Sequence, residues 1–377
     1  MKNTKAILIS DTHAALRLPM AHVDEGGVSS DRLRDVTKVL RQAVDVAAEE
    51  ECPLIILGDL FDQQRPSGAA LVAVSSVLRY AIDNGVEVFI LPGNHDAIGR
   101  DGRLYNLHLF NELKLPGVHV FKQKDVVEVT EGIRLHAVPW LPEGAAKRRI
   151  RKRARDCDPN GLDYLLVHQT IAGAVGDSGW VSDDGIEPGT MDRFTYALSG
   201  HYHLPQRHGS WGMYLGSPLM LNFAEAAEDQ RGFWLIDWAK PMTTSNPKLI
   251  VPDFPILASE TIDLEKGDRL DHLFDLTDFC STGVDYARLV LQGDREAIID
   301  ARTVVSEWRS KLDTFGLRHI KVDERPNRVA QARLKMKGAA FTLDEAVSAY
   351  AHQYGDEGEA SALASVGAAL LSAARSE

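Results

Sequence analysis

Five short polar segments lie in the first 205 residues, and each directly follows a short apolar run with the character of a β-strand. Strand-like runs at 6–10, 53–57 and 86–91 alternate with helical spacings at 32–50 and 71–81. This alternation predicts βαβ units and a largely parallel inner sheet. Because the carboxyl ends of parallel strands share one edge, the segments that follow them converge on one crevice. The five segments are Asp11-Thr12-His13, Gly58-Asp59-Leu60-Phe61-Asp62, Gly93-Asn94-His95-Asp96, Val167-His168-Gln169 and Gly200-His201-Tyr202-His203.

Imidazole and carboxylate groups dominate these segments. Together they suit manganese, iron or zinc, whereas oxygen ligands alone suit magnesium. An Asp and a His two residues apart at a strand end can bind one ion, and one carboxylate with two oxygens can bridge two ions. In the alternative, these residues are turn caps and core histidines, which requires four histidines and two aspartates to lie at strand ends by chance. The set therefore predicts a metal centre.

In this order, the motifs D-x-H, GD-x-x-D, GNHD, H and GHxH resemble the signature of calcineurin-like metallophosphoesterases. The resemblance implies an α/β fold, a four-layer αββα sandwich in which helices flank two sheets. It also implies two divalent metal ions, which we expect to be Mn²⁺, and a water activated by both metals that hydrolyses a phosphate ester. One ion would be held by Asp11, His13, Asp59 and His203, and the other by Asp59, Asn94, His168 and His201, with Asp59 bridging.

Three other polar residues in the same motifs are candidates for roles beside the metals. His95 follows the ligand Asn94 and is the candidate catalytic residue that stabilises charge or protonates the leaving group. Asp96 is expected either to orient His95 in catalysis or to cap the following turn. Asp62 fits a supporting position next to the ligands better than a ligand position.

Two segments are similar to the Mre11/SbcD nuclease branch of this superfamily. The motif at 58–62 is followed by Arg-Pro-Ser at 65–67, and Tyr-Leu-Gly-Ser-Pro-Leu at 214–219 precedes Asn222 and Glu225. The resemblance implies a metal-dependent DNA exonuclease or endonuclease in DNA repair or recombination. A phosphodiesterase or phosphatase of nucleotides or other small phosphate esters stays open as the alternative. A non-catalytic scaffold predicts lost ligands, and all seven ligand positions are filled.

A proline-rich stretch at 239–255 separates two parts of the chain and predicts a domain boundary. We expect a metallophosphoesterase domain over 1–240, closed by strands at 213–215 and 232–238 that complete a second sheet over the first. A strand at 288–291, a helix at 297–315 and a strand at 319–322 predict a small α+β domain over 255–325. The resemblance to the Mre11/SbcD branch implies that this is a capping or DNA-binding domain. The remainder, 338–377, has the spacing of a helical tail.

The resemblance also implies partners. In the family, two helices build a homodimer, and the segments 71–81 and 104–113 occupy those positions, although their apolar residues also suit a core. The family's C-terminal segment binds an ABC-type ATPase of the Rad50/SbcC kind. The tail at 341–375 is the candidate for that contact, and a frayed tail is the alternative.

The net charge of −12 argues against a general polyanion binder and permits only local basic patches. One such patch is the run 147–155, in which seven of nine residues are cationic. We expect it in a loop near the strand ends, where it would contact DNA phosphates; a solvated helix face is the alternative. Trp140, just before it, either stacks on a base or packs against the neighbouring prolines.

The sequence contains no apolar stretch of the length that a membrane span needs, about 18 residues. The N-terminus lacks the pattern of a signal peptide. The three cysteines, Cys52, Cys157 and Cys280, are far apart, which fits a reducing compartment. We therefore expect a cytoplasmic protein without a membrane partner.

Overall fold

The computed structural model describes residues 3–327, apart from residues 100, 123, 124, 177, 178, 210, 226–229 and 244. The expected tail at 338–377 lies outside the described residues. No helix in the described part of the chain is long and apolar enough to cross a membrane. Cys52, Cys157 and Cys280 are all unpaired.

The first sheet has six strands in the order β14-β13-β1-β2-β3-β6. Four of them are mutually parallel: β1 (Lys5–Ile9), β2 (Leu54–Leu57), β3 (Val88–Leu91) and β6 (Val118–Val120). The expectation that 232–238 joins the second sheet was wrong, because β13 (Phe233–Asp237) pairs antiparallel with β1. β14 (Lys248–Ile250) then pairs with β13 and extends this sheet beyond the expected boundary at 240. An apolar run predicts that a strand is buried. Which strand it pairs with depends on the path of the chain, and the run does not specify that path.

The second sheet has the order β11-β12-β10-β9-β8-β7. β8 (Ile133–Val138), β9 (Leu162–His168), β10 (Tyr196–Gly200) and β12 (Gly212–Tyr214) are parallel, whereas β7 (Val126–Thr130) and β11 (Gln206–His208) pair antiparallel at the edges. The parallel strands again place their carboxyl ends at one edge. This edge meets the corresponding edge of the first sheet.

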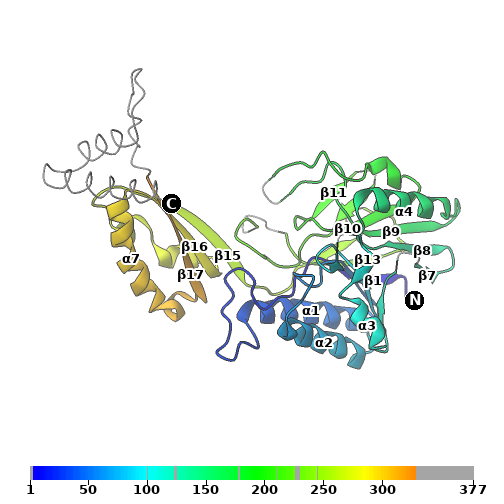
Figure 1. Cartoon of the computed structure of the whole chain (residues 1–377), viewed down its shortest axis with the longest axis horizontal. Helices are drawn as coiled ribbons and strands as arrows, with labels where there is room; N and C mark the ends of the chain where they lie inside the picture. Colours follow the sequence, from blue (N-terminus) through cyan, green and yellow to red (C-terminus); the bar gives the residue numbers. More distant parts are fainter. Residues whose placement is uncertain are drawn as a thin grey trace, which may run out of the picture. The chain divides into compact units, whose positions relative to one another are not determined.

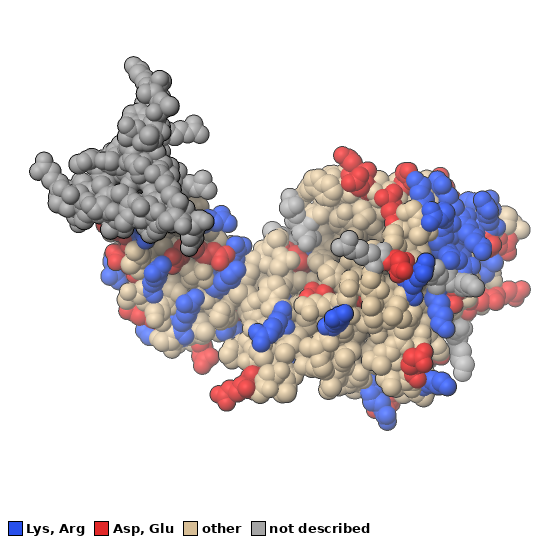
Figure 2. Space-filling model, in the orientation of Figure 1, with Lys and Arg blue, Asp and Glu red and all other residues tan. Residues whose placement is uncertain are grey.

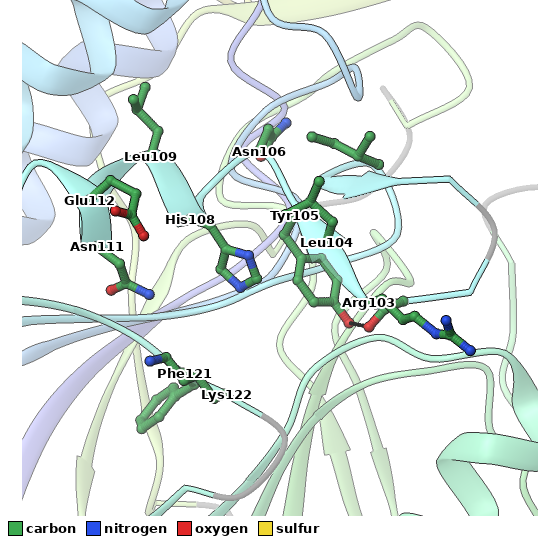
Figure 3. Close-up of a pocket in the computed structure, with 12 residues that line it drawn as sticks. Arg103, Leu104, Tyr105, Asn106, His108, Leu109, Asn111, Glu112, Phe121 and Lys122 are labelled. Atoms are coloured by element: carbon green, nitrogen blue, oxygen red, sulfur yellow. Dashed lines mark hydrogen bonds between the residues drawn. The ribbon is translucent and has the colours of Figure 1, made fainter.

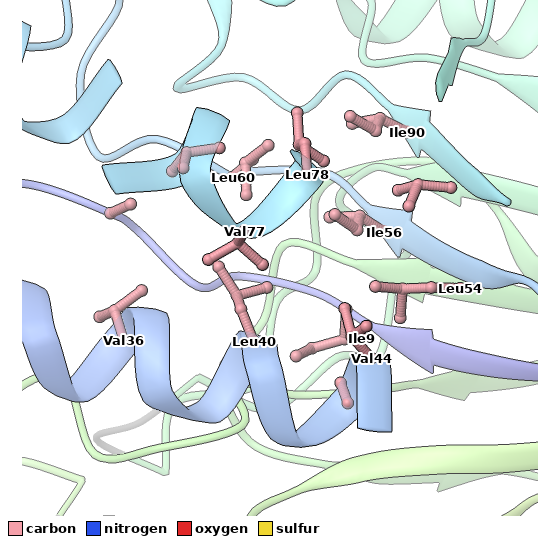
Figure 4. Packing of buried hydrophobic residues seen from close by; sticks show 14 of the residues in the cluster. Ile9, Val36, Leu40, Val44, Leu54, Ile56, Leu60, Val77, Leu78 and Ile90 are labelled. Carbon is pink, nitrogen blue, oxygen red and sulfur yellow. The ribbon is translucent and has the colours of Figure 1, made fainter. Parts of the chain in front are cut away.

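Alternate side chains of β1 show how the layers form. Ile7 and Ile9 pack with α1 (Asp31–Glu49) and α2 (Gly68–Asp83) on the outer face of the first sheet (Figure 4). Ala6 and Leu8 face the second sheet and share a core with it. Ser30 and Ser67 begin the two helices by accepting hydrogen bonds from Leu33 N and Ala70 N.

The outer face of the second sheet is covered by α4 (Glu143–Arg155), which completes the expected αββα sandwich (Figure 1). The loop expected for 147–155 was therefore wrong, since these residues form a helix. Ala146, Ile150 and Ala154 are buried along one side of α4, and this apolar spacing holds the basic run in helical form. The short 3₁₀ helix η1 (Pro188–Met191) packs beside it.

The helix expected over 104–113 is shorter in the structure. Leu104 and Tyr105 form β5 (Leu104–Tyr105), which pairs with β4 (Ala97–Ile98). The helix α3 then covers only His108–Glu112. Antiparallel pairing with the nearby residues 97–98 has replaced the first helical turn.

Residues 256–326 form a third sheet with its own core. β15 (Ile256–Leu264), β16 (Val284–Gly293) and β17 (His319–Pro326) are parallel, and α7 (Arg295–Arg309) connects the last two. The expected β-α-β unit is present. The helix ends at Arg309 rather than 315, where the 3₁₀ helix η2 (Leu312–Phe315) follows, and β15 was not predicted. Two short helices, α5 (Leu270–Leu273) and α6 (Leu276–Cys280), lie between β15 and β16.

The third sheet is attached to α1 by polar contacts. The hydroxyl of Tyr286 donates to Asp31 at 2.8 Å, and Arg318 pairs with Asp35 at 2.8 Å. Tyr286 also packs with Leu257 and Met220 in a small buried cluster. The described residues up to Pro326 belong to one compact unit.

Candidate metal centre

The five polar segments all lie where a strand ends. Asp11 and His13 follow β1, Asp59 follows β2, and Asn94 follows β3, whereas His168 ends β9 and the histidines at 201 and 203 follow β10. The turns are sharp, because Asp11, His13, Asp59 and His201 adopt positive φ values of 52°, 47°, 48° and 94°. Non-glycine residues adopt such angles at a cost of about 1–3 kcal/mol, and they are concentrated at functional sites.

One group of donors combines Asp11, His13 and His203, whose ligand atoms lie within 4.8 Å of one another. The Nε2 atoms of His13 and His203 are 3.1 Å apart. Nε2 of His13 is also 3.7 Å from Asp59 Oδ2, so Asp59 borders this group. These are the four residues expected for one metal ion.

The second group combines Asp59, His168 and His201, again within 4.8 Å. Nε2 of His168 lies 3.1 Å from Asp59 Oδ2 and 3.1 Å from Asn94 Oδ1. Nδ1 of His201 lies 2.8 Å from the same Asn94 oxygen. The geometry thus brings together the four residues expected for the other ion, with Asp59 between the two groups.

The directions of the ring nitrogens fit a cation. Nδ1 of His168 faces the carbonyl of Leu57 at 2.8 Å, and a carbonyl only accepts, so Nδ1 carries the proton. The lone pair on Nε2 of a neutral His168 then points at the oxygens of Asp59 and Asn94, which are also acceptors. Electron pairs that converge in this way need a positive charge between them, and a divalent metal ion supplies it.

The ionisation of the buried groups leads to the same conclusion. Burial lowers the pKa of His168, but the carboxylates of Asp59 and Asp11 outweigh burial and raise that pKa above its ordinary value. Burial raises the pKa of Asp59, yet the imidazoles of His168 and His13 outweigh it and lower that pKa. Burial and the neighbouring His168 lower the pKa of His201 to about 3, so its ring is neutral and able to act as a ligand. The pocket therefore favours a positive charge beside Asp59.

Two glycines allow this close packing. A Cβ on Gly58, which has φ of 90°, would lie 2.0 Å from Nδ1 of His168. A Cβ on Gly200 would lie 2.2 Å from the carbonyl oxygen of Leu57. Any side chain at either position would displace the ligands from the strand ends.

The family model of the calcineurin-like phosphoesterases matches residues 4–205, more than half of the chain, and includes all seven ligand positions. The chain belongs to the calcineurin-like phosphoesterase family. It is a metallophosphoesterase, and its two donor groups are the candidate halves of the dinuclear divalent metal centre that these enzymes use.

Three curated relatives of this phosphoesterase carry the name DNA double-strand break repair protein Mre11. The protein of Methanopyrus kandleri is 28% identical over 253 residues, which are 61% of this chain and 53% of the relative. The protein of Saccharolobus solfataricus is 27% identical over 243 residues (62% and 60%), and that of Sulfurisphaera tokodaii is 26% identical over 207 residues (54% and 50%). The chain thus matches about half to three-fifths of the length of these relatives.

Among solved structures, a dimetal phosphatase from Danio rerio aligns with 61% of this chain and 91% of its own length, at a TM-score of 0.37 and 13% identity. That likeness is too weak to bear on function.

His95 lies beside the candidate ligands of the phosphoesterase centre. Its ring is 4.7 Å from that of His13, centroid to centroid, and its backbone N–H donates to Asp59 Oδ1 at 2.8 Å. Nδ1 of His95 is 2.6 Å from the carbonyl oxygen of Asp62, so Nδ1 donates and Nε2 is left to hold or release a proton. The carboxylate of Asp62 contacts Nδ1 of His13 at 3.3 Å, which supports a role in orienting that ligand.

Asp96 is fully buried, and its carboxylate accepts the backbone N–H groups of Gly93 (2.9 Å) and Phe61 (3.2 Å). Burial, and then the charge of Asp59, raises the pKa of Asp96 to about 7. The ring of His95 contacts Asp62 instead. Both amides precede Asp96 in the chain, so its carboxylate ties the second motif to the third rather than capping the following turn.

Sequence reasoning assigned no role to Glu225, which the structure buries completely behind His203. Nδ1 of His203 donates to Glu225 Oε1 at 2.9 Å, and Arg231 pairs with Glu225 Oε2 at 3.2 Å. Burial raises the pKa of Glu225, but the hydrogen bond and charge of His203, together with the charge of Arg231, outweigh burial and lower that pKa. A carboxylate in this position fixes the tautomer of a metal-binding histidine. Thr170 Oγ1, 3.0 Å from Nε2 of His201, is a similar contact in the other group.

Proposed function

We propose that the chain is a metal-dependent DNA nuclease, acting as an exonuclease or endonuclease in DNA repair or recombination. The observation that carries the proposal is the pair of donor groups that share Asp59, with His95 directly beside them. The three relatives named as DNA double-strand break repair proteins support DNA as the substrate.

Two divalent cations bound to these groups supply a nucleophilic water at neutral pH and neutralise charge on the phosphate oxygens. The strand ends that carry the donors are tied together, because the carboxylate of Asp11 accepts the backbone N–H of His201, at 3.0 and 3.1 Å for its two oxygens. Nε2 of His95 delivers a proton to the leaving oxygen, since Nδ1 is fixed to the carbonyl of Asp62. The mixed nitrogen and oxygen donors suit manganese, iron or zinc, and of these we propose Mn²⁺ as the metal.

Residues 255–325 are proposed to cap the crevice and contribute to DNA binding. The separate core of the third sheet and its contacts from Tyr286 and Arg318 to α1 support a small rigid unit of this kind. An enzyme that acts only on small esters has no need of it.

The decisive experiment compares two substrates in Mn²⁺, a 3′-recessed DNA duplex and a generic small phosphodiester. We expect the duplex to be cleaved with a much higher kcat/KM, with no cleavage by Asp59→Asn. His272→Ala changes an exposed histidine in α5 and serves as the matched control. Turnover of the small ester with intact DNA would overturn the nuclease proposal and leave a phosphodiesterase of nucleotides or other small phosphate esters.

We also propose that the protein is a homodimer with α3 at the interface. Ile98, Leu104 and Leu109 are 39%, 50% and 41% exposed and line one hollow of about 620 Å³ (Figure 3). Figure 3 shows the ring of His108 between Tyr105 and Asn111 in this hollow. Apolar side chains gathered in this way favour a protein surface as the occupant.

A Rad50/SbcC-type ABC ATPase is the proposed second partner, through the segment 338–377 outside the described residues. Co-purification with such an ATPase, compared between the full chain and a chain ending at residue 327, tests this contact. Equal recovery of the ATPase with both chains would place the contact elsewhere or remove it.

A further inference from the structure

Helix α4 carries two separate faces. Ala146, Ile150 and Ala154 pack into the core beneath the second sheet. Arg148, Arg151, Lys152 and Arg155 follow the spacing i, i+3, i+4, i+7, so they form one stripe on the opposite, exposed side. The packing of α4 against the second sheet therefore does not require these basic side chains.

The charges of this stripe are not neutralised by ion pairs. Within the described part of the chain, none of the four side chains has an acidic partner within 4.0 Å. Glu187, near Arg151, pairs instead with Lys147. Figure 2 shows basic side chains gathered over α4 on a chain whose net charge is −12.

The helix dipole accounts for only part of this pattern. Cations in the last turn, Lys152 and Arg155 among them, are favourable there, as is Glu143 in the first turn. Arg148 and Arg151 lie outside the last turn, and the pairs 148/152 and 151/155 place like charges one turn apart, which disfavours the helix. A binding function explains why the stripe is basic along its whole length.

The helix that carries the stripe follows a strand that ends near the metal centre. Val138 at the end of β8 pairs in register with Val167, the neighbour of His168. Trp140 N donates to the carbonyl of Pro92 at 2.9 Å, and Pro92 directly precedes the Gly93-Asn94 motif. The chain then enters α4 at Glu143, so the helix leads away from the crevice edge.

Two hollows accompany the stripe. One, of about 780 Å³, is lined by Arg148 and Lys152 on α4, and by Arg103 and its ion-pair partner Asp101 on the facing loop. The other, of about 410 Å³, is lined by Arg151, Arg155 and Arg193, together with Glu187, which pairs with Lys147. Most of the positive charge in both hollows thus comes from the stripe itself, and its spread over the length of α4 suits a polyanionic strand rather than an isolated anion.

We propose that the stripe of Arg148, Arg151, Lys152 and Arg155 binds the phosphate backbone of DNA outside the catalytic crevice. At a rise of about 1.5 Å per residue, the seven steps from Arg148 to Arg155 cover about 10 Å. Phosphates of one strand advance about 3.4 Å each along duplex DNA, so the stripe spans about three of them. The contact is independent of sequence and holds the substrate that the metal centre cleaves. This inference rests on DNA as the substrate.

The test replaces all four residues by Gln, which is a good helix former. A matched variant replaces four exposed cations elsewhere, Arg34, Lys38, Arg79 and Lys248, and removes the same total charge. Both are compared with the unmodified chain in Mn²⁺ for DNA affinity at several salt concentrations and for turnover of a small phosphodiester. Circular dichroism and thermal unfolding check that the variants keep the helix content and the stability of the unmodified chain.

We expect the α4 variant to bind a 30-base-pair duplex at least about tenfold more weakly at low salt. The slope of log affinity against log salt concentration should be smaller by about three, because about three fewer counterions are released. KM for DNA should rise while turnover of the small ester stays unchanged, and the matched variant should behave like the unmodified chain. Unchanged DNA affinity and salt slope in the α4 variant would overturn the proposal that the stripe binds DNA, while the nuclease proposal would stand. Equal losses of DNA affinity in both variants would show that only net charge matters, and would also overturn the proposal for the stripe. Failure of the unmodified chain to bind or cleave DNA would instead remove the proposed function, and this inference with it.

Discussion

The Nε2 nitrogens of His13 and His203 face each other at 3.1 Å across the edge where the two sheets meet. Nδ1 of His203 donates to Glu225 and Nδ1 of His13 contacts Asp62, so the neutral rings direct lone pairs at each other. Lone pairs at this separation repel unless both nitrogens bind one cation. The two strand ends are therefore arranged to share a metal ion.

Asp59 borders both donor groups, so its replacement should affect both ions. Asp59→Asn is expected to remove most of the bound metal, whereas His13→Ala and His201→Ala should each remove about one ion of the two. Elemental analysis after dialysis measures the number of ions per chain. His272→Ala should retain both. Two ions retained in Asp59→Asn would rule out the bridging position.

His95→Ala should retain the metals but lose cleavage. If Nε2 protonates the leaving oxygen, kcat falls by about 10²–10⁴-fold on DNA, where the leaving group is an alkoxide. The loss should be far smaller on a p-nitrophenyl ester, whose leaving group needs no proton. Parallel kinetics on both substrates measure the difference. Equal losses on both would assign His95 to charge stabilisation, and no loss would exclude it from the reaction.

Glu225→Gln tests the carboxylate behind His203. A neutral amide no longer favours the Nδ1–H tautomer, so we expect metal affinity to fall by about 10–100-fold. Arg231, which is buried beside Glu225, loses its charged partner, which should lower the free energy of unfolding by about 3–5 kcal/mol. Metal titration and thermal unfolding measure the two effects. Thr170→Val removes the contact beside His201 but leaves Arg231 paired with Glu225, so it should lower metal affinity without the loss of stability. Unchanged metal affinity in Glu225→Gln would refute the orienting role of Glu225.

His136 should make stability depend on pH. Its ring is fully buried and 2.6 Å from Asp163, and burial outweighs that hydrogen bond and lowers the pKa of His136. Its folded pKa thus lies below the unfolded value of about 6.5, and the unfolded chain takes up the proton first. Stability is then complete above about pH 6.5 and falls as pH decreases toward the folded pKa, with a slope of at most about 1.4 kcal/mol per pH unit.

Denaturant unfolding between pH 5 and 7.5 measures this slope. His136→Gln keeps a donor for Asp163 and does not titrate, so the variant should show a shallower decline than the unmodified chain. His119→Gln, which changes a half-exposed histidine, is the control. Identical slopes in His136→Gln and the unmodified chain would contradict the assignment.

The dimer should depend on the hollow beside α3. Leu109→Asp places a charge among exposed apolar side chains and is expected to shift the protein to monomer. Val28→Asp changes a side chain that is 69% exposed and lies outside this hollow, and should leave the oligomeric state unchanged. Sedimentation equilibrium measures both, and a stable dimer in Leu109→Asp would exclude this face.

The site was predictable because its residues follow strands in a fixed order. The segments after β1, β2, β3, β9 and β10 each begin where an apolar run ends, and parallel strands bring such ends together. Edge pairing was not predictable in this way. The run at 233–237 is a strand in either sheet by its composition, and only the return of the chain beside Lys5 assigns it to the first.

The sequence by itself determined the seven donors, the parallel strands that carry them and the helices α1 and α2, because each is a local pattern of apolar spacing and polar residues. Only the tertiary structure decided which atoms support those donors. Glu225 stands behind His203, Asp62 holds both His13 and His95, and Asp96 binds the amides of Gly93 and Phe61. The basic run at 147–155 became a helix with one free stripe because its apolar residues found a sheet to pack against. Such contacts join residues far apart in the chain, and no local pattern specifies them.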